Sequence, residues 1–137
     1  LMRDEHGAKS TNFLPTVIPE DIYGDIADKV KEYLQEDNTE MSRKWLDFGI
    51  DRSTLKRSVM VMPYGGTFYS CRAYIDEWYQ DKIRKKKLIN PFSENDRYRC
   101  TGYLAQLSWR AIHEVLKKSP DSSHWGWLYR WLYYTAG

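Results

Sequence analysis

The segment R-S-T-L-K-R-S-V-M-V-M-P-Y-G, residues 52–65, is the part of the chain around which we expect the fold to be organised. If it is helical, Arg52, Lys56, Met60 and Tyr64 recur every four residues. They then form one ridge, with neighbours about 6 Å apart along the helix axis. Two cations and an aromatic ring are therefore predicted to share one side of a helix.

The opposite side of this helix is expected to be buried, because Val59 and the run 60–62 supply apolar side chains. Pro63 lacks an amide donor and crowds the preceding turn, so regular helix is expected to kink or end near Met62. Tyr64 would then lie at a bend. The glycines that follow it can adopt backbone angles that other residues avoid.

The chemistry of this ridge suits a nucleoside triphosphate. Arg52 can grip phosphate oxygens with its planar guanidinium, and Lys56 supplies a point charge one turn away. Arg57 adds a third cation beside Lys56, and Tyr64 offers a ring for stacking and a hydroxyl for a hydrogen bond. The alternative is a basic amphipathic helix with a solvated charged face and a core tyrosine.

The same segment, preceded by W-L-D-F-G-I, resembles motif B of the single-subunit, bacteriophage-type DNA-directed RNA polymerases. Three further segments occur in the family's order: R-D-E-H-G-A with N-F-L-P at the start, P-E-D-I-Y-G at 19–24 and G-Y-L-A-Q-L-S-W at 102–109. The resemblance implies an all-α, irregular multi-helix fingers subdomain of a right-hand polymerase, as a fragment of a larger chain. Residues 1–137 would form one domain, with 1–18 connecting to the palm and 19–137 forming the helical fingers.

The resemblance also implies roles for single residues. Arg52 and Lys56 would hold the incoming triphosphate, and Lys56 would help to neutralise or protonate the pyrophosphate. Tyr64 would close the pocket and contribute to the choice of ribonucleotides, so that Lys56 and Tyr64 are the catalytic candidates. Gly65 would let the backbone approach the template. Tyr23 would lie near the nucleotide pocket and face the motif B helix, with a core aromatic as the alternative.

No metal site is expected within the chain. Its acidic residues are scattered, and its three histidines have no zinc-like spacing. In the polymerase family, Mg²⁺ is held by palm aspartates, which the resemblance places before Leu1 and after Gly137. The chain alone is therefore predicted to be inactive.

The implied partners are ribonucleoside triphosphates, the DNA template, the RNA product and the rest of the polymerase chain, with no membrane. The implied location is the cytoplasm of an infected bacterial host, with a mitochondrial origin as the second possibility.

Whole-chain charge does not indicate nucleic-acid binding, because 21 Lys and Arg face 19 Asp and Glu, a net charge of +2. Residues 82–87, K-I-R-K-K-K, concentrate cations that suit a nucleic-acid backbone, chiefly Lys85, Lys86 and Lys87. A solvated helix end is the alternative. Tyr69 and Arg72 are expected to share the pocket of Tyr64 or to touch a template strand. Their alternatives are ordinary packing and a surface ion pair, respectively.

Periodicity and capping residues predict the other helices. One begins at Pro19 with the stripe Ile22, Ile26, Val30 and Tyr33 or Leu34, and a second covers 40–48. Asp51 or Ser53 can cap the motif helix, and Thr67 a helix with Phe68, Cys71, Ile75 and Trp78 on one side. A long helix starts near Asp96, with Cys100, Tyr103 or Leu104, Leu107, Ala111 and Val115 on one face, and a last aromatic helix follows Pro120.

Two other function classes remain open at this level. One is the fingers of a family A DNA polymerase, and the other is a non-enzymatic helical module that binds nucleic acid through residues 82–87. The 6 Trp and 11 Tyr suit a core, a stacking surface or an interdomain contact. Cys71 and Cys100 are expected to be reduced thiols, with one disulfide as the alternative. No apolar run approaches the length of a membrane span.

Overall fold

The computed structural model describes residues 20–61 and 66–118, and within these ranges it contains five helices and no strand. The all-α class predicted from the sequence is therefore confirmed. The helices are α2 (Glu20–Asp37), α3 (Glu40–Phe48), α4 (Arg52–Val61), α5 (Phe68–Lys86) and α6 (Arg97–Lys118). The expected connection 1–18, the bend at Pro63, Tyr64, Gly65 and the helix after Pro120 lie outside the described residues.

The bounds of α3 follow from its two ends. The Thr39 hydroxyl accepts a hydrogen bond from the Ser42 amide, and the Ser42 hydroxyl accepts one from the Thr39 amide. This reciprocal pair satisfies two amides that a helix start leaves open. Gly49 ends the helix at φ 99°, a conformation that side chains disfavour. The predicted range 40–48 is confirmed.

Asp51, and not Ser53, caps α4: the Asp51 carboxylate accepts a hydrogen bond from the Ser53 amide at 3.0 Å. The buried side of α4 consists of Thr54, Leu55, Ser58 and Val59. Met60 is 39% exposed, so the expectation that the run from Met60 onward is buried is wrong at this residue. Met60 instead continues the exposed ridge, eight residues after Arg52 and four after Lys56.

Helix α5 begins at a second capping box, formed by Thr67 and Ser70, and ends at Lys87 in the left-handed conformation. Cys71 and Ile75 are buried as predicted. The third fully buried position is Tyr79 and not its neighbour Trp78, which is only partly covered. Tyr79 packs edge-on against Trp45, with ring centroids 5.4 Å apart.

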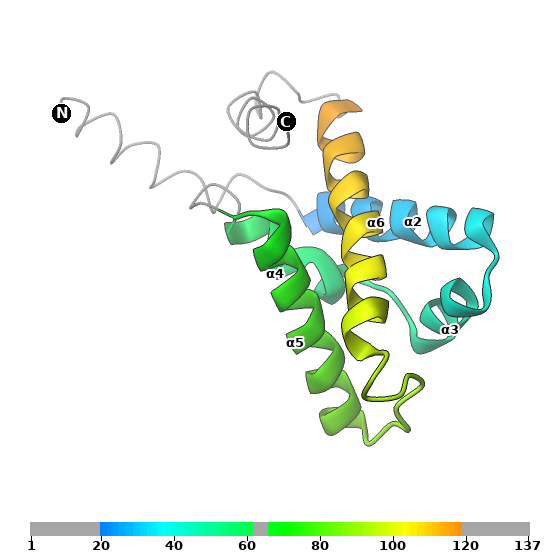
Figure 1. Cartoon of the computed structure of the whole chain (residues 1–137). Helices are drawn as coiled ribbons and strands as arrows, with labels where there is room; N and C mark the ends of the chain where they lie inside the picture. Colours follow the sequence, from blue (N-terminus) through cyan, green and yellow to red (C-terminus); the bar gives the residue numbers. More distant parts are fainter. Residues whose placement is uncertain (1–19, 62–65, 119–137) are drawn as a thin grey trace, which may run out of the picture.

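Helix α6 buries more of its circumference than a single stripe. Cys100, Leu104 and Ala111 are buried as predicted, whereas Leu107 and Val115 are only partly covered. The prediction missed a second set of buried positions on this helix: Thr101, Ala105, Ser108, Ile112 and Leu116. The reason is tertiary, because α6 packs against both α2 and α5 (Figure 1). The two hydroxyls are satisfied within the helix, as Ser108 donates to the Leu104 carbonyl at 2.8 Å.

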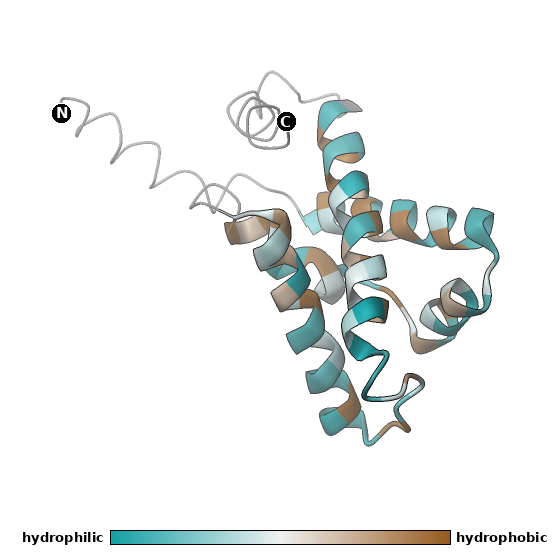
Figure 2. Ribbon diagram, viewed as in Figure 1, coloured by the Kyte–Doolittle hydropathy of each residue, from teal (hydrophilic) through white to brown (hydrophobic). Residues whose placement is uncertain are grey.

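The helices enclose one core. Helix α2 crosses behind α6 and also packs on α3 and α4, while α4 lies along α5 (Figure 1). The helices alternate apolar and polar positions, as Figure 2 shows. Trp45 is fully buried, with the Phe92 ring 4.7 Å away, and its indole N–H donates to the Cys100 carbonyl at 3.2 Å. The loop 88–96 is thereby tied to α3.

Both cysteines are buried, and no disulfide joins them. Among helices α2 to α6, none is long and apolar enough to cross a membrane.

Candidate functional site

Arg52 and Lys56 lie on one side of α4 and face the first half of α2. The Lys56 ammonium is 3.1 Å from the Glu20 carboxylate, and the Arg52 guanidinium lies over Gly24, where a Cβ atom would be 3.5 Å from Nε. Positions rise along α2 as they fall along α4, so the two helices run antiparallel here. The structure thus brings the two predicted phosphate-binding cations together, both exposed, one helical turn apart.

Tyr23 lies beneath this pair. Its ring centroid is 5.7 Å from the Lys56 ammonium, a distance at which the ring face attracts a cation, and the residue is 2% exposed. Burial, and next the nearby Glu20 carboxylate, raise the pKa of its hydroxyl. Tyr23 is therefore a core residue that also faces the motif helix, and its place near a nucleotide pocket stays a prediction.

The sequence analysis missed Glu20 as a member of this site. Its carboxylate pairs with Lys56 across 36 positions of sequence, and the two side chains are 57% and 46% exposed. Exposed pairs of this kind contribute about 0–1 kcal/mol, so another anion can displace the carboxylate. Its spacing in the sequence could have identified it, because Glu20, Tyr23 and Gly24 share a helix face at i, i+3 and i+4.

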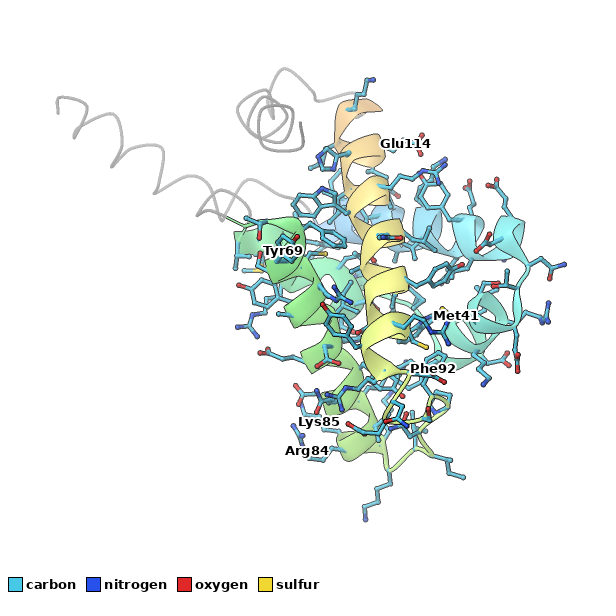
Figure 3. The ribbon with its side chains drawn as sticks, in the orientation of Figure 1. Met41, Tyr69, Arg84, Lys85, Phe92 and Glu114 are labelled. Atoms are coloured by element: carbon cyan, nitrogen blue, oxygen red, sulfur yellow. The ribbon has the colours of Figure 1, made fainter. Side chains whose placement is uncertain are left out.

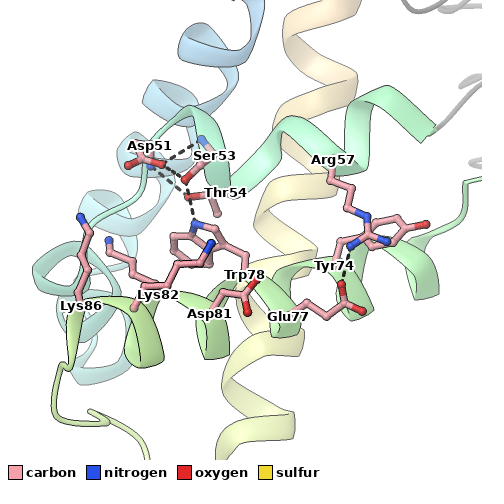
Figure 4. A pocket seen from close by; sticks show the side chains of 11 residues that line it. Asp51, Ser53, Thr54, Arg57, Tyr74, Glu77, Trp78, Asp81, Lys82 and Lys86 are labelled. Carbon is pink, nitrogen blue, oxygen red and sulfur yellow. Dashed lines mark hydrogen bonds and ion pairs between the residues drawn. The ribbon is translucent and has the colours of Figure 1, made fainter.

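Arg57 lies elsewhere. It projects toward α5, where its guanidinium is 2.5 Å from the Glu77 carboxylate and 4.3 Å from the centre of the Tyr74 ring (Figure 4). One residue advances a helix by about 100°, which takes Arg57 off the side that carries Lys56. The structure does not bring Arg57 together with Arg52 and Lys56.

Arg57 and Tyr74 line a groove between α4 and α5 with a volume of about 330 Å³ (Figure 4). Its floor includes Trp78, whose indole N–H donates to the Ser53 hydroxyl at 3.0 Å. Basic and acidic side chains alternate around the groove; the acidic members are Asp51, Glu77 and Asp81. Burial raises the pKa of the Asp51 carboxyl, but hydrogen bonds from Ser53 together with the Lys82 charge and the Thr54 contact outweigh burial and hold this pKa below its ordinary value.

Lys82 is not a free member of the basic run 82–87. Its ammonium donates to the Phe48 carbonyl at 2.7 Å and to the Gly49 carbonyl at 3.0 Å, which stabilises the end of α3. Burial lowers its pKa. Lys85, Lys86 and Lys87 are exposed, and no described carboxylate forms an ion pair with any of them.

Tyr69 and Arg72 lie in different surroundings. Tyr69 is 75% exposed at the start of α5. Arg72 forms no ion pair with a carboxylate in the described ranges: its guanidinium stacks 3.5 Å from the centre of the Tyr98 ring and donates to the Tyr98 carbonyl at 3.0 Å. It also lies so close to Gly102 that a Cβ atom there would be 2.6 Å from Nη2. Arg72 joins α5 to α6.

Within residues 20–61 and 66–118, no three His, Cys, Asp or Glu side chains gather where one metal ion could bind all of them. The assignment of the magnesium site to palm aspartates outside this chain stays a prediction.

Comparison with known proteins gives a consistent result. The family model described as DNA-dependent RNA polymerase matches residues 1–130. Among curated proteins, the chain is 30% identical to T7 RNA polymerase of Escherichia phage T7 and 28% identical to the DNA-directed RNA polymerase of Enterobacteria phage T3; each alignment covers 91% of this chain and 17% of the relative. It is also 28% identical to the mitochondrial DNA-directed RNA polymerase of Mus musculus, over 96% of this chain and 11% of the relative. The chain thus spans about a sixth or less of these relatives.

Proposed function

Because the chain belongs to the DNA-dependent RNA polymerase family, we propose that it forms the nucleotide-binding fingers of such an enzyme. Arg52 and Lys56 bind the triphosphate of an incoming ribonucleotide, and the ring of Tyr23 supports Lys56 from below. The observation that carries the proposal is the placement of both cations on the exposed side of α4 that faces α2. Tyr64 and Gly65 complete the site in the residues that follow α4.

The local charges support this assignment. The triphosphate carries several negative charges, whereas Glu20 carries one and is exposed. A bound triphosphate therefore replaces Glu20 as the partner of Lys56, and Arg52 adds a two-pronged contact one turn away. In this proposal Lys56 also neutralises or protonates the departing pyrophosphate.

In this proposal, the chain alone binds the nucleotide but does not catalyse its transfer. Metal ions held by paired carboxylates supply the activation of the attacking hydroxyl in this type of reaction. We assign those carboxylates to a palm outside this chain, together with the DNA template and the RNA product as partners of the assembled enzyme. The relatives include phage and mitochondrial enzymes, and we favour a phage origin with action in the host cytoplasm.

The first prediction tests the triphosphate site on the 137-residue chain. Lys56→Ala removes a charged contact to phosphate and is expected to raise the Kd for ATP by about tenfold or more, as measured by isothermal titration calorimetry. Glu20→Gln is expected to lower the Kd, because it removes the anion that competes for Lys56.

A variant with Lys85, Lys86 and Lys87 all changed to Gln is the matched control. It removes more charge than Lys56→Ala and should leave the Kd for ATP within about twofold, because its side chains lie outside the site. If ATP binding followed the basic run and ignored Lys56, the chain would be a nucleic-acid-binding module of the second kind considered above.

A further inference from the structure

The end of α5 and the loop after it form a surface that the nucleotide site does not use. We call residues 84–89 the basic tip: Arg84, Lys85, Lys86 and Lys87, followed by Leu88 and Ile89. Arg84 and Lys85 project away from the body of the molecule (Figure 3). Ile89 is 92% exposed, the most exposed large apolar side chain in the described ranges.

The charge of the tip is largely uncompensated. Arg84 pairs with Asp81, but Lys85, Lys86 and Lys87 have no ion pair with a described carboxylate. Lys85 and Lys86 also line the groove between α4 and α5. Three adjacent free ammonium groups are complementary to a row of phosphates, since each phosphate contact releases a condensed counterion.

The loop that carries Ile89 is anchored on both sides of this residue. The next residue, Asn90, bonds through its side-chain oxygen to the Tyr79 hydroxyl and to the Phe92 amide. Phe92 is 6% exposed and packs on Trp45. At the other end, Lys87 closes α5 in the left-handed conformation, with its amide bonded to the Ile83 carbonyl. An apolar side chain held on a fixed support between such anchors is suited to insertion into another molecule.

We propose that the basic tip binds duplex DNA, with Lys85, Lys86 and Lys87 on backbone phosphates and Ile89 inserted as an apolar wedge at a base step. Proteins that kink DNA combine these two elements: cations along the backbone and an isoleucine or similar side chain that partly unstacks one step. Pyrimidine–purine steps unstack most readily, so a TA step is the preferred target. The basic tip contains no residue of the Arg52–Lys56 site, so DNA binding by the tip can be tested independently of nucleotide binding.

The test uses the 137-residue chain and a 20-base-pair duplex with 2-aminopurine at a central TA step. Wild type is expected to bind with an affinity that falls steeply with salt and to raise the 2-aminopurine fluorescence, which reports unstacking. Changing Lys85, Lys86 and Lys87 to Gln should reduce the slope of log Kd against log salt by about 3 and weaken binding by about tenfold or more at low salt.

Two controls are needed. One tests whether the position of the lost charges matters, and the other tests the apolar side chain of Ile89 without changing the charge. The variant Lys31→Gln, Arg43→Gln, Lys117→Gln removes the same charge from other elements and should keep the slope within about 1 of wild type. Ile89→Ser should keep the slope but abolish the fluorescence rise, and Ile89→Leu should restore it.

Several outcomes overturn the proposal. An unchanged slope of log Kd against log salt in the Lys85–Lys87 variant would show that these lysines do not contact phosphates. A full fluorescence rise in Ile89→Ser would show that Ile89 does not unstack the bases. Binding to phosphatidylserine vesicles without binding to the duplex would assign the tip to a lipid surface instead. Circular dichroism melts of every variant verify that the fold is retained.

Discussion

At the scale of single residues, identical side chains in one sequence run have different tasks. The run 82–87 reads as five cations in six positions, yet Lys82 donates to two carbonyls at the end of α3, while Lys85, Lys86 and Lys87 extend into solvent. Lys82 also lies 4.6 Å from the centre of the Phe48 ring. The helix period explains the division, because Lys82 shares its side of α5 with Trp78, four residues earlier.

This difference predicts the effect of one substitution. Lys82→Met keeps the aliphatic stem but leaves the Phe48 and Gly49 carbonyls without their donor, so it is expected to lower the free energy of unfolding by about 1–3 kcal/mol. Lys85→Met changes an exposed, unpaired side chain and should stay within about 0.5 kcal/mol of wild type. Urea unfolding of both variants measures the difference, and equal values would show that the carbonyl contacts contribute nothing.

At the scale of elements, the junction of α5 and α6 depends on an arginine lying against a glycine. Gly102 has no side chain, and the Arg72 guanidinium occupies the space where one would be. The Arg72 Nε atom is buried there and has no hydrogen-bond partner among the described residues, while Tyr98 holds the rest of the guanidinium. The glycine is therefore explained by close packing and not by an unusual backbone angle.

A double-mutant cycle tests this junction. Gly102→Ala alone is expected to destabilise the protein by about 1–3 kcal/mol, because the new Cβ displaces Arg72 from Tyr98. With Arg72→Ala already present, the space is open, and Gly102→Ala should stabilise by up to about 1 kcal/mol through helix propensity. Thermal unfolding of the four proteins gives the coupling energy. Additive effects would contradict the steric explanation.

At the scale of the whole molecule, a single buried core makes stability dependent on pH. Burial raises the pKa of the Cys71 thiol to about 11, against the opposing effect of Ser58. Below about pH 9 the thiol is neutral in both states, and its contribution to stability is fully present. Above that pH it ionises first in the unfolded chain, so stability is lost as pH rises toward the folded pKa.

The expected loss from Cys71 is about 1.4 kcal/mol per pH unit between pH 9 and 11. Cys71→Ala should show a correspondingly shallower decline of the unfolding free energy over this range, measured by urea titration at half-unit steps. Burial also raises the pKa of Tyr79 to about 12. The stability lost when such buried tyrosines ionise at higher pH is the same in both proteins. Parallel curves for the two proteins would contradict a buried, neutral thiol.

The amino-acid sequence by itself determined the helices and the ridge. Capping residues and the 3.6-residue period act over about four positions, so the range 40–48 and the cap Thr67 could be predicted without a structure, whereas the cap Thr39 was found only in the structure. The order of motifs likewise indicated the polymerase family, which the family model confirms.

Only the tertiary structure decided the partners. Glu20 meets Lys56 across 36 positions, Lys82 meets Phe48 across 34, and Arg72 meets Tyr98 across 26. It also decided that α6 is buried on more than one face, since two helices pack on it. The physical reason is range: these contacts arise when separate helices bury their apolar sides against each other, and no local pattern specifies which polar side chains that packing places within reach.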